Sequence, residues 1–260
     1  MYVDSADLPV IRYLMSAPAG RAPANRSLEW LKWFGLAAMS IGHTIAHPVM
    51  DLAEMDRFVE VYGLAIVFGA PALPIFCSLI VWRIAHASAK VLPGYLKRLG
   101  AWGLLSQPIY FLWVPGLGMW APNALATLCF GALGCALLVQ RRWPWLLVLL
   151  GTLFALSESI GRDWSLVLVM VFGLLLVQRA GLNWPGLLAL LTTFATARMA
   201  LPYDALSFQW SMSLITVPLL WWLATRLPAQ PGRLPGWMFY AWYPFHLGLI
   251  VLAWRLFALS

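Results

Sequence analysis

The chain has 260 residues, of which 62% are hydrophobic and only 10% are charged. A soluble globular domain carries about 25% charged residues, so this composition excludes a cytosolic enzyme and a disordered chain and predicts a polytopic membrane protein. The excess of 17 basic over 10 acidic residues would suggest nucleic-acid binding in a soluble protein. No basic cluster alternates with aromatic residues here, so we expect no nucleic acid and place the positive charge in cytoplasmic loops.

The chain divides into a polar tail and a hydrophobic domain. Residues 1–27 are rich in Pro and Ala and lack a signal-peptide core, so we expect a cytoplasmic tail. Residues 28–260 are expected to form an all-α membrane bundle of about nine transmembrane helices, with eight or ten also compatible with the sequence. A membrane-spanning helix needs about 20 apolar residues. The candidate segments are 30–47, 61–82, 95–113, 123–139, 143–160, 164–178, 183–203, 208–225 and 237–258.

Positive charge is distributed unevenly between the loops of this nine-span arrangement. Thirteen Lys and Arg residues fall on the side of the N-terminus, and four fall on the opposite side. Cytoplasmic loops of membrane proteins carry an excess of Lys and Arg. The pattern therefore predicts a cytoplasmic N-terminus and a C-terminus on the outer side.

The first predicted span carries ionisable groups where apolar residues are expected. His43 and His47 are four residues apart and share one helical face, and Pro48 is expected to end the helix. Polar side chains inside spans are costly and are therefore candidates for function. Three interpretations stay open. A histidine acts as a general base, the pair binds a metal with Asp51 or Glu54, or both histidines hydrogen-bond neighbouring helices.

The third and fourth predicted spans add polar residues at two depths. Lys97 and Arg98 lie at the expected inner boundary, where they either anchor the helix or bind an anionic cytoplasmic cosubstrate. Gln107 falls deeper in the third span. Asn123 opens the fourth span, either as a helix N-cap or as a polar group of an outer cavity.

The last predicted span contains a histidine next to a proline. Residues 237–247 read Trp-Met-Phe-Tyr-Ala-Trp-Tyr-Pro-Phe-His-Leu, and Pro244 is expected to kink the helix. A histidine in an otherwise aromatic helix is hard to explain by packing alone, so we interpret His246 as a functional residue. Its depth is comparable to that of His43 and Gln107, which predicts one shared cavity if their spans are neighbours.

Five segments together resemble the TraX family of conjugation-associated membrane proteins, which includes the F-pilin acetylase. The resemblance covers about residues 30–258, and its most specific segment is the Tyr-Pro-x-His-Leu close within 239–247. The other four segments are LKWFGLAAMSIGH (31–43), GAPALPIF (69–76), YLKRLGAWGLLSQPIYF (95–111) and NALATLCFGAL (123–133). Two positions depart from the family pattern: its acid before the first histidine is Gly42 here, and its second-span arginine is Ala70.

The resemblance implies a reaction and a location. The family is also distantly similar to multispanning acyltransferases that O-acylate surface sugars. It implies transfer of an acetyl group from acetyl-CoA to the N-terminal amine of a pilin subunit. It also implies a multi-pass protein of the bacterial inner membrane, whose expected partners are the pilin, acetyl-CoA and membrane lipid.

Acyl transfer to an amine needs a base and hydrogen-bond donors for the oxyanion. Under the resemblance we expect His43 and His246 to be catalytic, with His43 as the base, although the two roles could be exchanged. We expect Lys97 and Arg98 to bind acetyl-CoA. The residues expected to orient the thioester or stabilise the oxyanion are Gln107, Asn123 and Tyr243.

Three other functions are compatible with the sequence. The departures at Gly42 and Ala70 favour a non-catalytic assembly factor that holds pilin subunits in the membrane. An enzyme of the same fold could instead acylate a hydroxyl of a glycan or lipid. A small-solute transporter is disfavoured, because the sequence shows no internal repeat or broken-helix pattern. No Cys-x-x-Cys pair or other zinc motif is present, so no metal site is assigned.

Overall fold

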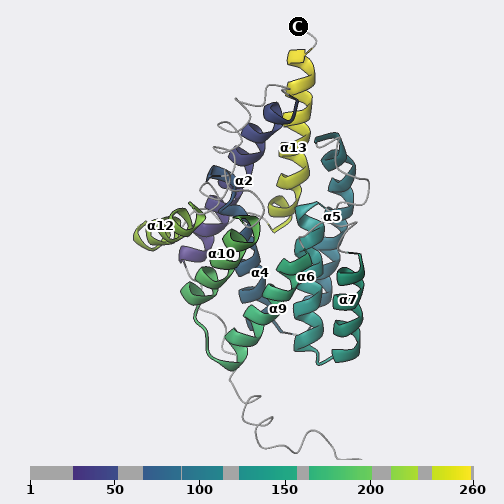
Figure 1. Ribbon diagram of the computed structural model, residues 1–260, viewed down its shortest axis with the longest axis vertical. Coiled ribbons are helices and arrows are strands. Elements are labelled where there is room, and N and C mark those ends of the chain that lie inside the picture. Colours follow the sequence, from purple (N-terminus) through teal and green to yellow (C-terminus); the bar gives the residue numbers. More distant parts are fainter. Residues whose placement is uncertain are drawn as a thin grey trace, which may run out of the picture.

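The computed structural model describes residues 26–51, 67–88, 90–113, 123–156, 164–200, 212–227 and 236–258. Within these ranges the chain is helical and contains no strand (Figure 1). The helices are α2 (Arg26–Asp51), α4 (Ala72–His86), α5 (Leu92–Trp113), α6 (Ala124–Val139), α7 (Trp143–Ala155), α9 (Trp164–Arg179), α10 (Trp184–Ala200), α12 (Ser213–Arg226) and α13 (Gly236–Ala258). Each overlaps one of the segments predicted from the sequence. The all-α fold is therefore confirmed.

The first helix is longer than predicted at both ends. α2 begins at Arg26, inside the predicted tail, and continues past Pro48 to Asp51. The expectation that Pro48 ends the helix is wrong, because losing the one backbone hydrogen bond that its nitrogen would donate does not interrupt the helical backbone here. The rest of the predicted tail lies outside the described residues, as does the side chain of His47.

The helices differ in whether they match the thickness of a membrane. Among the described residues, the helical stretch Val67–His86 is long and apolar enough to cross one. Four further apolar helices have 10–17 residues, which is below the length of about 20 residues that a span needs. The nine membrane crossings and the cytoplasmic N-terminus therefore stay predictions.

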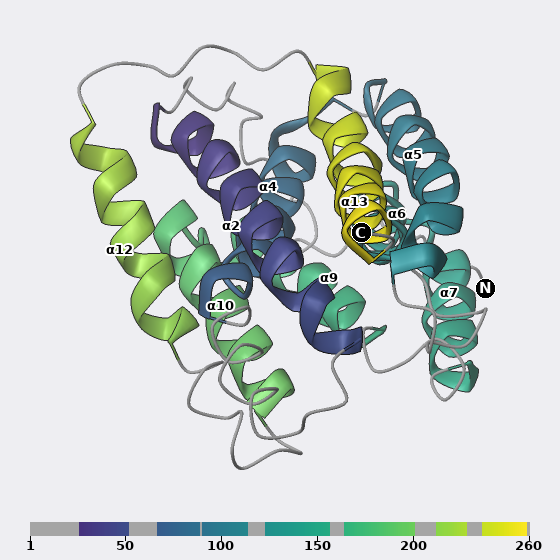
Figure 2. The ribbon, with the colours of Figure 1, turned by 90° about the horizontal axis from the view of Figure 1, so that it is seen from above.

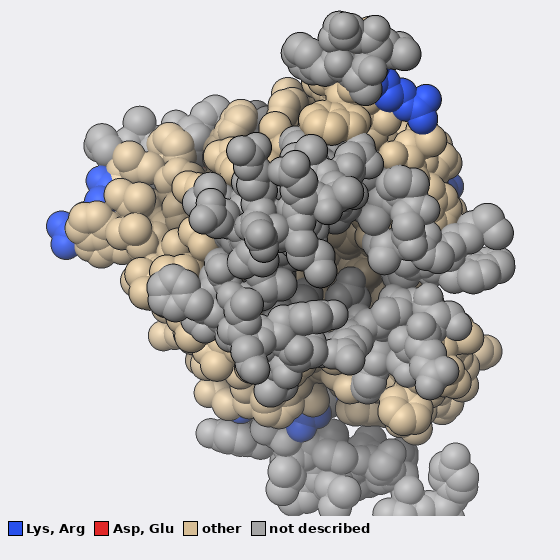
Figure 3. Space-filling view, turned by 45° about the horizontal axis from the view of Figure 1, so that its top comes forward, with Lys and Arg blue, Asp and Glu red and all other residues tan. Residues whose placement is uncertain are grey.

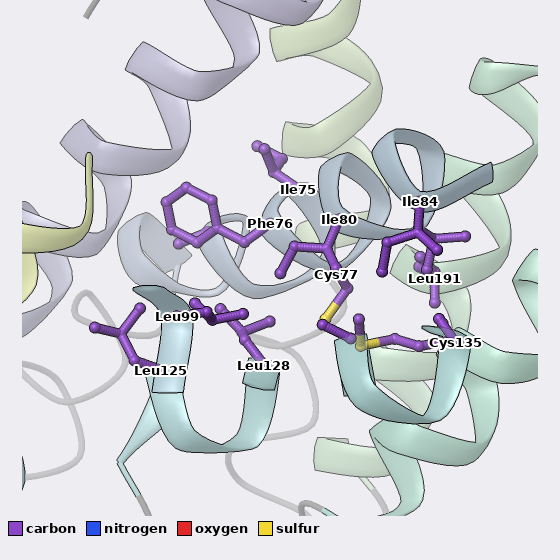
Figure 4. Packing of buried hydrophobic residues seen from close by; sticks show 14 of the residues in the cluster. Ile75, Phe76, Cys77, Ile80, Ile84, Leu99, Leu125, Leu128, Cys135 and Leu191 are labelled. Atoms are coloured by element: carbon purple, nitrogen blue, oxygen red, sulfur yellow. The ribbon is translucent and has the colours of Figure 1, made fainter. Parts of the chain in front are cut away.

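The core of the bundle is built around α4. This helix contacts α2, α6, α9 and α10, and Figure 2 shows it between them. Figure 4 shows how its apolar side chains meet those of the neighbouring helices. The residues labelled there are Ile75, Phe76, Cys77, Ile80 and Ile84 of α4, with Leu99, Leu125, Leu128, Cys135 and Leu191 around them. A helix that is apolar on every face is one that other helices surround, which explains the composition of α4.

Large apolar side chains also cover the outside of the bundle. Leu104 is 79% exposed, Leu147 is 67% exposed and Phe154 is 65% exposed. In Figure 3 the described part of the visible face is mostly uncharged, and Lys and Arg side chains lie at its margins. A protein surrounded by water rarely exposes so many large apolar residues.

α2 packs closely, through glycines, against α4 and the residues just before it. A Cβ atom at Gly35 would lie 2.9 Å from the ring of Phe76, and one at Gly69 would lie 3.0 Å from the Cα of Gly42. Because 35 faces 76 while 42 faces 69, the two segments run antiparallel. The glycine that replaces the acid expected before His43 therefore lies at a contact between two backbones, where small residues allow helices to pack tightly.

Candidate active site

Two helices from opposite ends of the chain, α2 and α13, pack side by side (Figures 1 and 2). The indole N–H of Trp242 donates a hydrogen bond of 2.8 Å to the hydroxyl of Ser40. One turn further along, Nδ1 of His43 lies 2.8 Å from Nε2 of His246. The residue numbers rise together along this seam, so the two helices run parallel. The prediction that His43 and His246 come together is confirmed.

The proton positions in the histidine pair follow from its neighbours. Nδ1 of His246 lies 2.8 Å from the carbonyl oxygen of Trp242, which can only accept, so Nδ1 carries a hydrogen. In the neutral ring Nε2 is then an acceptor, and it receives the Nδ1–H of His43. The neutral ring of His43 consequently has its lone pair on Nε2. This is the atom that a general base would use.

Aromatic rings hold the two imidazoles in a defined orientation. The rings of His43 and His246 are nearly parallel, with centroids 5.1 Å apart and an interplanar angle of 7°. Tyr243 meets both rings edge-on, at 5.9 Å from His43 and 5.8 Å from His246. Trp242 is stacked against His246 with centroids 6.2 Å apart. Tyr243 and His246 are both buried, so the pair is fixed by packing as well as by hydrogen bonds.

A mostly apolar cavity of about 270 Å³ borders the seam. It is lined by Trp33, Leu36, Ala37, Ser40 and Ile41 of α2 and by Met238 and Trp242 of α13. The hydroxyl of Ser40 and the indole N–H of Trp242 bond each other. A ligand in this cavity would therefore meet mainly apolar walls, one helical turn before the histidines.

A second polar pair joins α5 to α6. Asn123 is the N-cap of α6, because its Oδ1 accepts a hydrogen bond of 3.0 Å from the N–H of Ala126. Its amide nitrogen donates to the carbonyl of Gly103 and to Oε1 of Gln107, both at 2.7 Å. Both amide hydrogens are thus engaged in structural bonds. The N-cap interpretation of Asn123 is confirmed, and these bonds disfavour its expected role at the oxyanion.

The side-chain oxygen of Gln107 is bonded to Asn123. Its Oε1 accepts from the backbone N–H of Asn123 at 3.1 Å as well as from the side chain of Asn123. Because the oxygen is turned toward Asn123, the amide nitrogen of Gln107 points away from it. α5 also packs against α13, but a cavity that Gln107 shares with the histidines stays a prediction.

A family model described as TraX protein matches residues 27–253, which span α2 through most of α13. The chain belongs to the TraX protein family. No curated protein matches the chain, and no solved structure does.

In this TraX chain, a glycine precedes His43, and His246 is bonded to the ring of His43. Gly42 stands where the family pattern has an acid, and that position is occupied by the contact with Gly69. Nδ1 of His43 is instead bonded to His246. An acceptor on Nδ1 fixes the tautomer and the ring orientation of a catalytic histidine, as the aspartate of a catalytic triad does. His246 supplies such an acceptor from another helix.

The two predicted cosubstrate residues of the TraX chain differ in their surroundings. Arg98 lies close to the hydroxyl of Tyr240 on α13 and interacts with it electrostatically. Lys97 is exposed. Tyr240 lies six residues before His246, which corresponds to about 9 Å along the helix. Arg98 is therefore connected to the helix that carries the histidine, toward its N-terminal end.

The sequence interpretation missed two features of the site. Ser40 and Trp242 were not paired, although they lie three and four residues before the two histidines on the same helices. Arg83 was counted only as a loop charge, whereas its guanidinium lies over the ring of Tyr95, 4.8 Å from the centroid. The spacing of Ser40 and Trp242 was a usable signal. No signal in the sequence predicted the contact of Arg83 with Tyr95, because that contact depends on how α4 and α5 pack.

The metal interpretation receives no additional ligands from the structure. Within the part of the chain that the structure describes, no three His, Cys, Asp or Glu side chains come together. The side chains of His47, Asp51 and Glu54, which the sequence suggested as further ligands, lie outside it.

Proposed function

We propose that this TraX chain is a membrane-embedded acyltransferase that moves an acetyl group from acetyl-CoA to the N-terminal amine of a conjugative pilin subunit. Family membership supports the conjugation context. The observation that carries the proposal is the hydrogen bond between His43 and His246, which sets the tautomer and the orientation of the His43 ring.

The proposed reaction uses the two histidines as follows. The amine nitrogen attacks the thioester carbonyl while Nε2 of His43 removes its proton. The carbon–nitrogen bond forms, the carbon–sulfur bond breaks, and the proton on His43 passes to the leaving thiolate. His246 holds the ring of His43 and stabilises the imidazolium through the bond to Nδ1. The products are an N-acetylated chain and coenzyme A, so neither an oxidant nor an enzyme nucleophile is required.

Two further residues predicted to contact the substrates are Tyr243 and Gln107. Tyr243 lies edge-on against both imidazoles, so we assign its hydroxyl group to the oxyanion or thioester. The amide nitrogen of Gln107 is a second donor for the same purpose. We place the acyl group in the apolar cavity beside Ser40 and Trp242, since that cavity borders the seam that carries the histidines.

The bacterial inner membrane is the proposed location. Large exposed apolar residues on the described helices support contact with lipid. The parallel course of α2 and α13 agrees with the nine-span arrangement, in which the first and the ninth crossing run in the same direction. Under that arrangement the N-terminal end of α13, with Arg98 nearby, faces the cytoplasm, where acetyl-CoA is made.

The test is the intact mass of pilin from conjugating cells that carry the wild-type chain, His43→Ala or His246→Ala. We expect one acetyl group on pilin with the wild type and its loss or strong reduction in both variants. Quantification of the membrane protein itself excludes loss by degradation. Thr225→Ala is a matched control, because its exposed hydroxyl also bonds a helix carbonyl, on α12.

Two results would contradict the proposal. Pilin that is unmodified in wild-type cells with normal piliation would indicate a non-catalytic assembly factor. A modified glycan or lipid beside unmodified pilin would indicate an acyltransferase with a hydroxyl acceptor.

A further inference from the structure

Three helices converge on a tyrosine–arginine cluster, formed by Arg83, Tyr95, Arg98 and Tyr240. Arg83, in the last turn of α4, lies over the ring of Tyr95 on α5. Tyr240 on α13 lies beside Tyr95, with ring centroids 6.4 Å apart, and both arginines lie close enough to interact with its hydroxyl. Both tyrosines are 5% exposed, whereas both arginines are exposed. The cluster therefore has a buried aromatic floor and a cationic rim.

The positive charge of this rim has no described counter-charge. The sequence contains no Asp or Glu between residues 61 and 157. Among the side chains that the structure describes, the one carboxylate is Glu29, and it pairs with Lys32 at 2.6 Å. Arg83 forms no hydrogen bond or ion pair within the described residues, and its ring contact keeps the guanidinium beside Tyr95. Two guanidinium groups held near one point without an acid attract an anion.

The position of the cluster relates it to the histidine pair. Tyr240, Tyr243 and His246 follow one another at intervals of three residues on the buried face of α13. The cluster thus lies about 9 Å along the helix from the imidazoles. A ligand that carries phosphate at one end and a reactive group at the end of a flexible arm could bridge the two places.

We propose that the tyrosine–arginine cluster binds phosphate groups of the acyl donor, with Arg83 and Arg98 as the phosphate ligands and the Tyr95–Tyr240 pair as the support that positions them. The inference rests on the proposed function for the identity of the donor, coenzyme A. It adds Arg83 as a donor-binding residue, and it assigns the bidentate role to arginine, whose planar fork matches phosphate, in preference to the exposed Lys97.

The experiment uses the purified full chain in nanodiscs of phosphatidylcholine, titrated with coenzyme A by calorimetry. We expect Arg83→Gln and Arg98→Gln each to weaken binding about tenfold, as the loss of a charge-assisted hydrogen bond predicts. Arg83→Lys, which keeps the charge but not the fork, should fall between. Pantetheine, the phosphate-free part of coenzyme A, should bind weakly and equally to all variants.

Arg142→Gln is the matched control, since it removes an exposed arginine from the α6–α7 connection. Its affinity for coenzyme A should equal that of the wild type. Size-exclusion elution and thermal melting identify any variant that fails to fold, and Tyr240→Phe then tests the cluster with the ring retained. An unchanged affinity in both arginine variants would overturn the inference, as would an equal loss in Arg142→Gln.

A lipid headgroup also carries phosphate, so retention of phosphatidylglycerol is measured by lipid mass spectrometry on the same variants. A loss of bound phosphatidylglycerol with unchanged coenzyme A affinity would overturn the donor assignment. The pilin mass measurement separates this inference from the proposed function. Acetylated pilin with arginine-independent coenzyme A binding would contradict only the inference, whereas arginine-dependent binding without acetylation would contradict only the acyl transfer.

Discussion

The seam between α2 and α13 and the seam between α5 and α6 both contain polar side chains that the sequence marks as unusual. At the α5–α6 seam, Asn123 caps a helix and binds Gly103 and Gln107, so each polar atom of its side chain is committed to a structural bond. At the α2–α13 seam, the bonds run from the carbonyl of Trp242 through His246 to Nδ1 of His43. The first arrangement caps a helix and joins it to a neighbour, and the second sets the tautomer of an imidazole.

Polar groups inside a helix bundle stabilise it or react, and their hydrogen bonds help to separate the two roles. Both kinds are costly to bury and both hold helices together. A group whose donors and acceptors are all bonded to the protein contributes stability when intact and leaves orphaned partners when removed. A group that ends in an acceptor nitrogen can exchange a proton with a substrate. Substitutions at the two seams should therefore separate effects on the transfer rate from effects on the free energy of unfolding.

The largest expected effect concerns which of the two histidines acts as the general base. With the purified chain, acetyl-CoA and a pilin peptide, His43→Ala should lower the transfer rate about 1000-fold, because the base is removed. His246→Ala should lower it about 100-fold, because the base remains but loses its orientation. Initial rates from released coenzyme A measure both. A larger loss in His246→Ala than in His43→Ala would assign the base to His246.

The next largest effect is expected at the seam between α5 and α6. Asn123→Ala should lower the free energy of unfolding by about 2–4 kcal/mol, because it removes the cap and orphans the partners on Gly103 and Gln107. Unfolding in mixtures of detergent and dodecyl sulfate measures the loss. The transfer rate per folded molecule should stay within about twofold of the wild type.

Asn183→Ala is the control for this variant. Asn183 accepts one hydrogen bond of 2.9 Å from the N–H of Gly186 and is exposed. Its loss should cost only about 1 kcal/mol, the value of a simple cap. Equal destabilisation by the two variants would show that the bonds from Asn123 to α5 contribute nothing.

A smaller effect is expected where α2 is packed against the segment before α4. Gly69→Ala should lower the free energy of unfolding by about 1–3 kcal/mol, because the new methyl group meets the backbone of Gly42 next to His43. Gly151→Ala should instead raise it by up to about 1 kcal/mol, since nothing lies within 4 Å of that position in α7. Detergent unfolding curves compare them. Destabilisation by Gly151→Ala would show that the backbone contact with Gly42 does not explain the loss of stability in Gly69→Ala.

The smallest effect is expected at Ser40. Ser40→Ala removes the acceptor of the indole N–H of Trp242, which should cost about 1 kcal/mol in stability. We expect the transfer rate to fall about threefold, because Trp242 also supplies the carbonyl that orients His246. The measurement is the same coenzyme A release assay, with Thr225→Ala unchanged. A wild-type transfer rate in Ser40→Ala would show that the bond between Ser40 and Trp242 does not help to orient the histidines.

Which segments are helical and which residues are chemically unusual can be read from the sequence. Continuous apolar runs placed each described helix, and His43 and His246 were identified because imidazoles are rare in such runs. These properties can be read within one segment, since hydropathy and residue type are local.

The contacts of each polar group, in contrast, depend on the tertiary structure. The saturation of Asn123, the contact of Gly42 with Gly69 and the position of Arg83 over Tyr95 depend on which helices are neighbours and how each is rotated about its axis. Those choices are made by packing among segments far apart in the chain, where helices that are apolar on every face carry little information about their partners. The tautomer of His43 follows from the same long-range pairing.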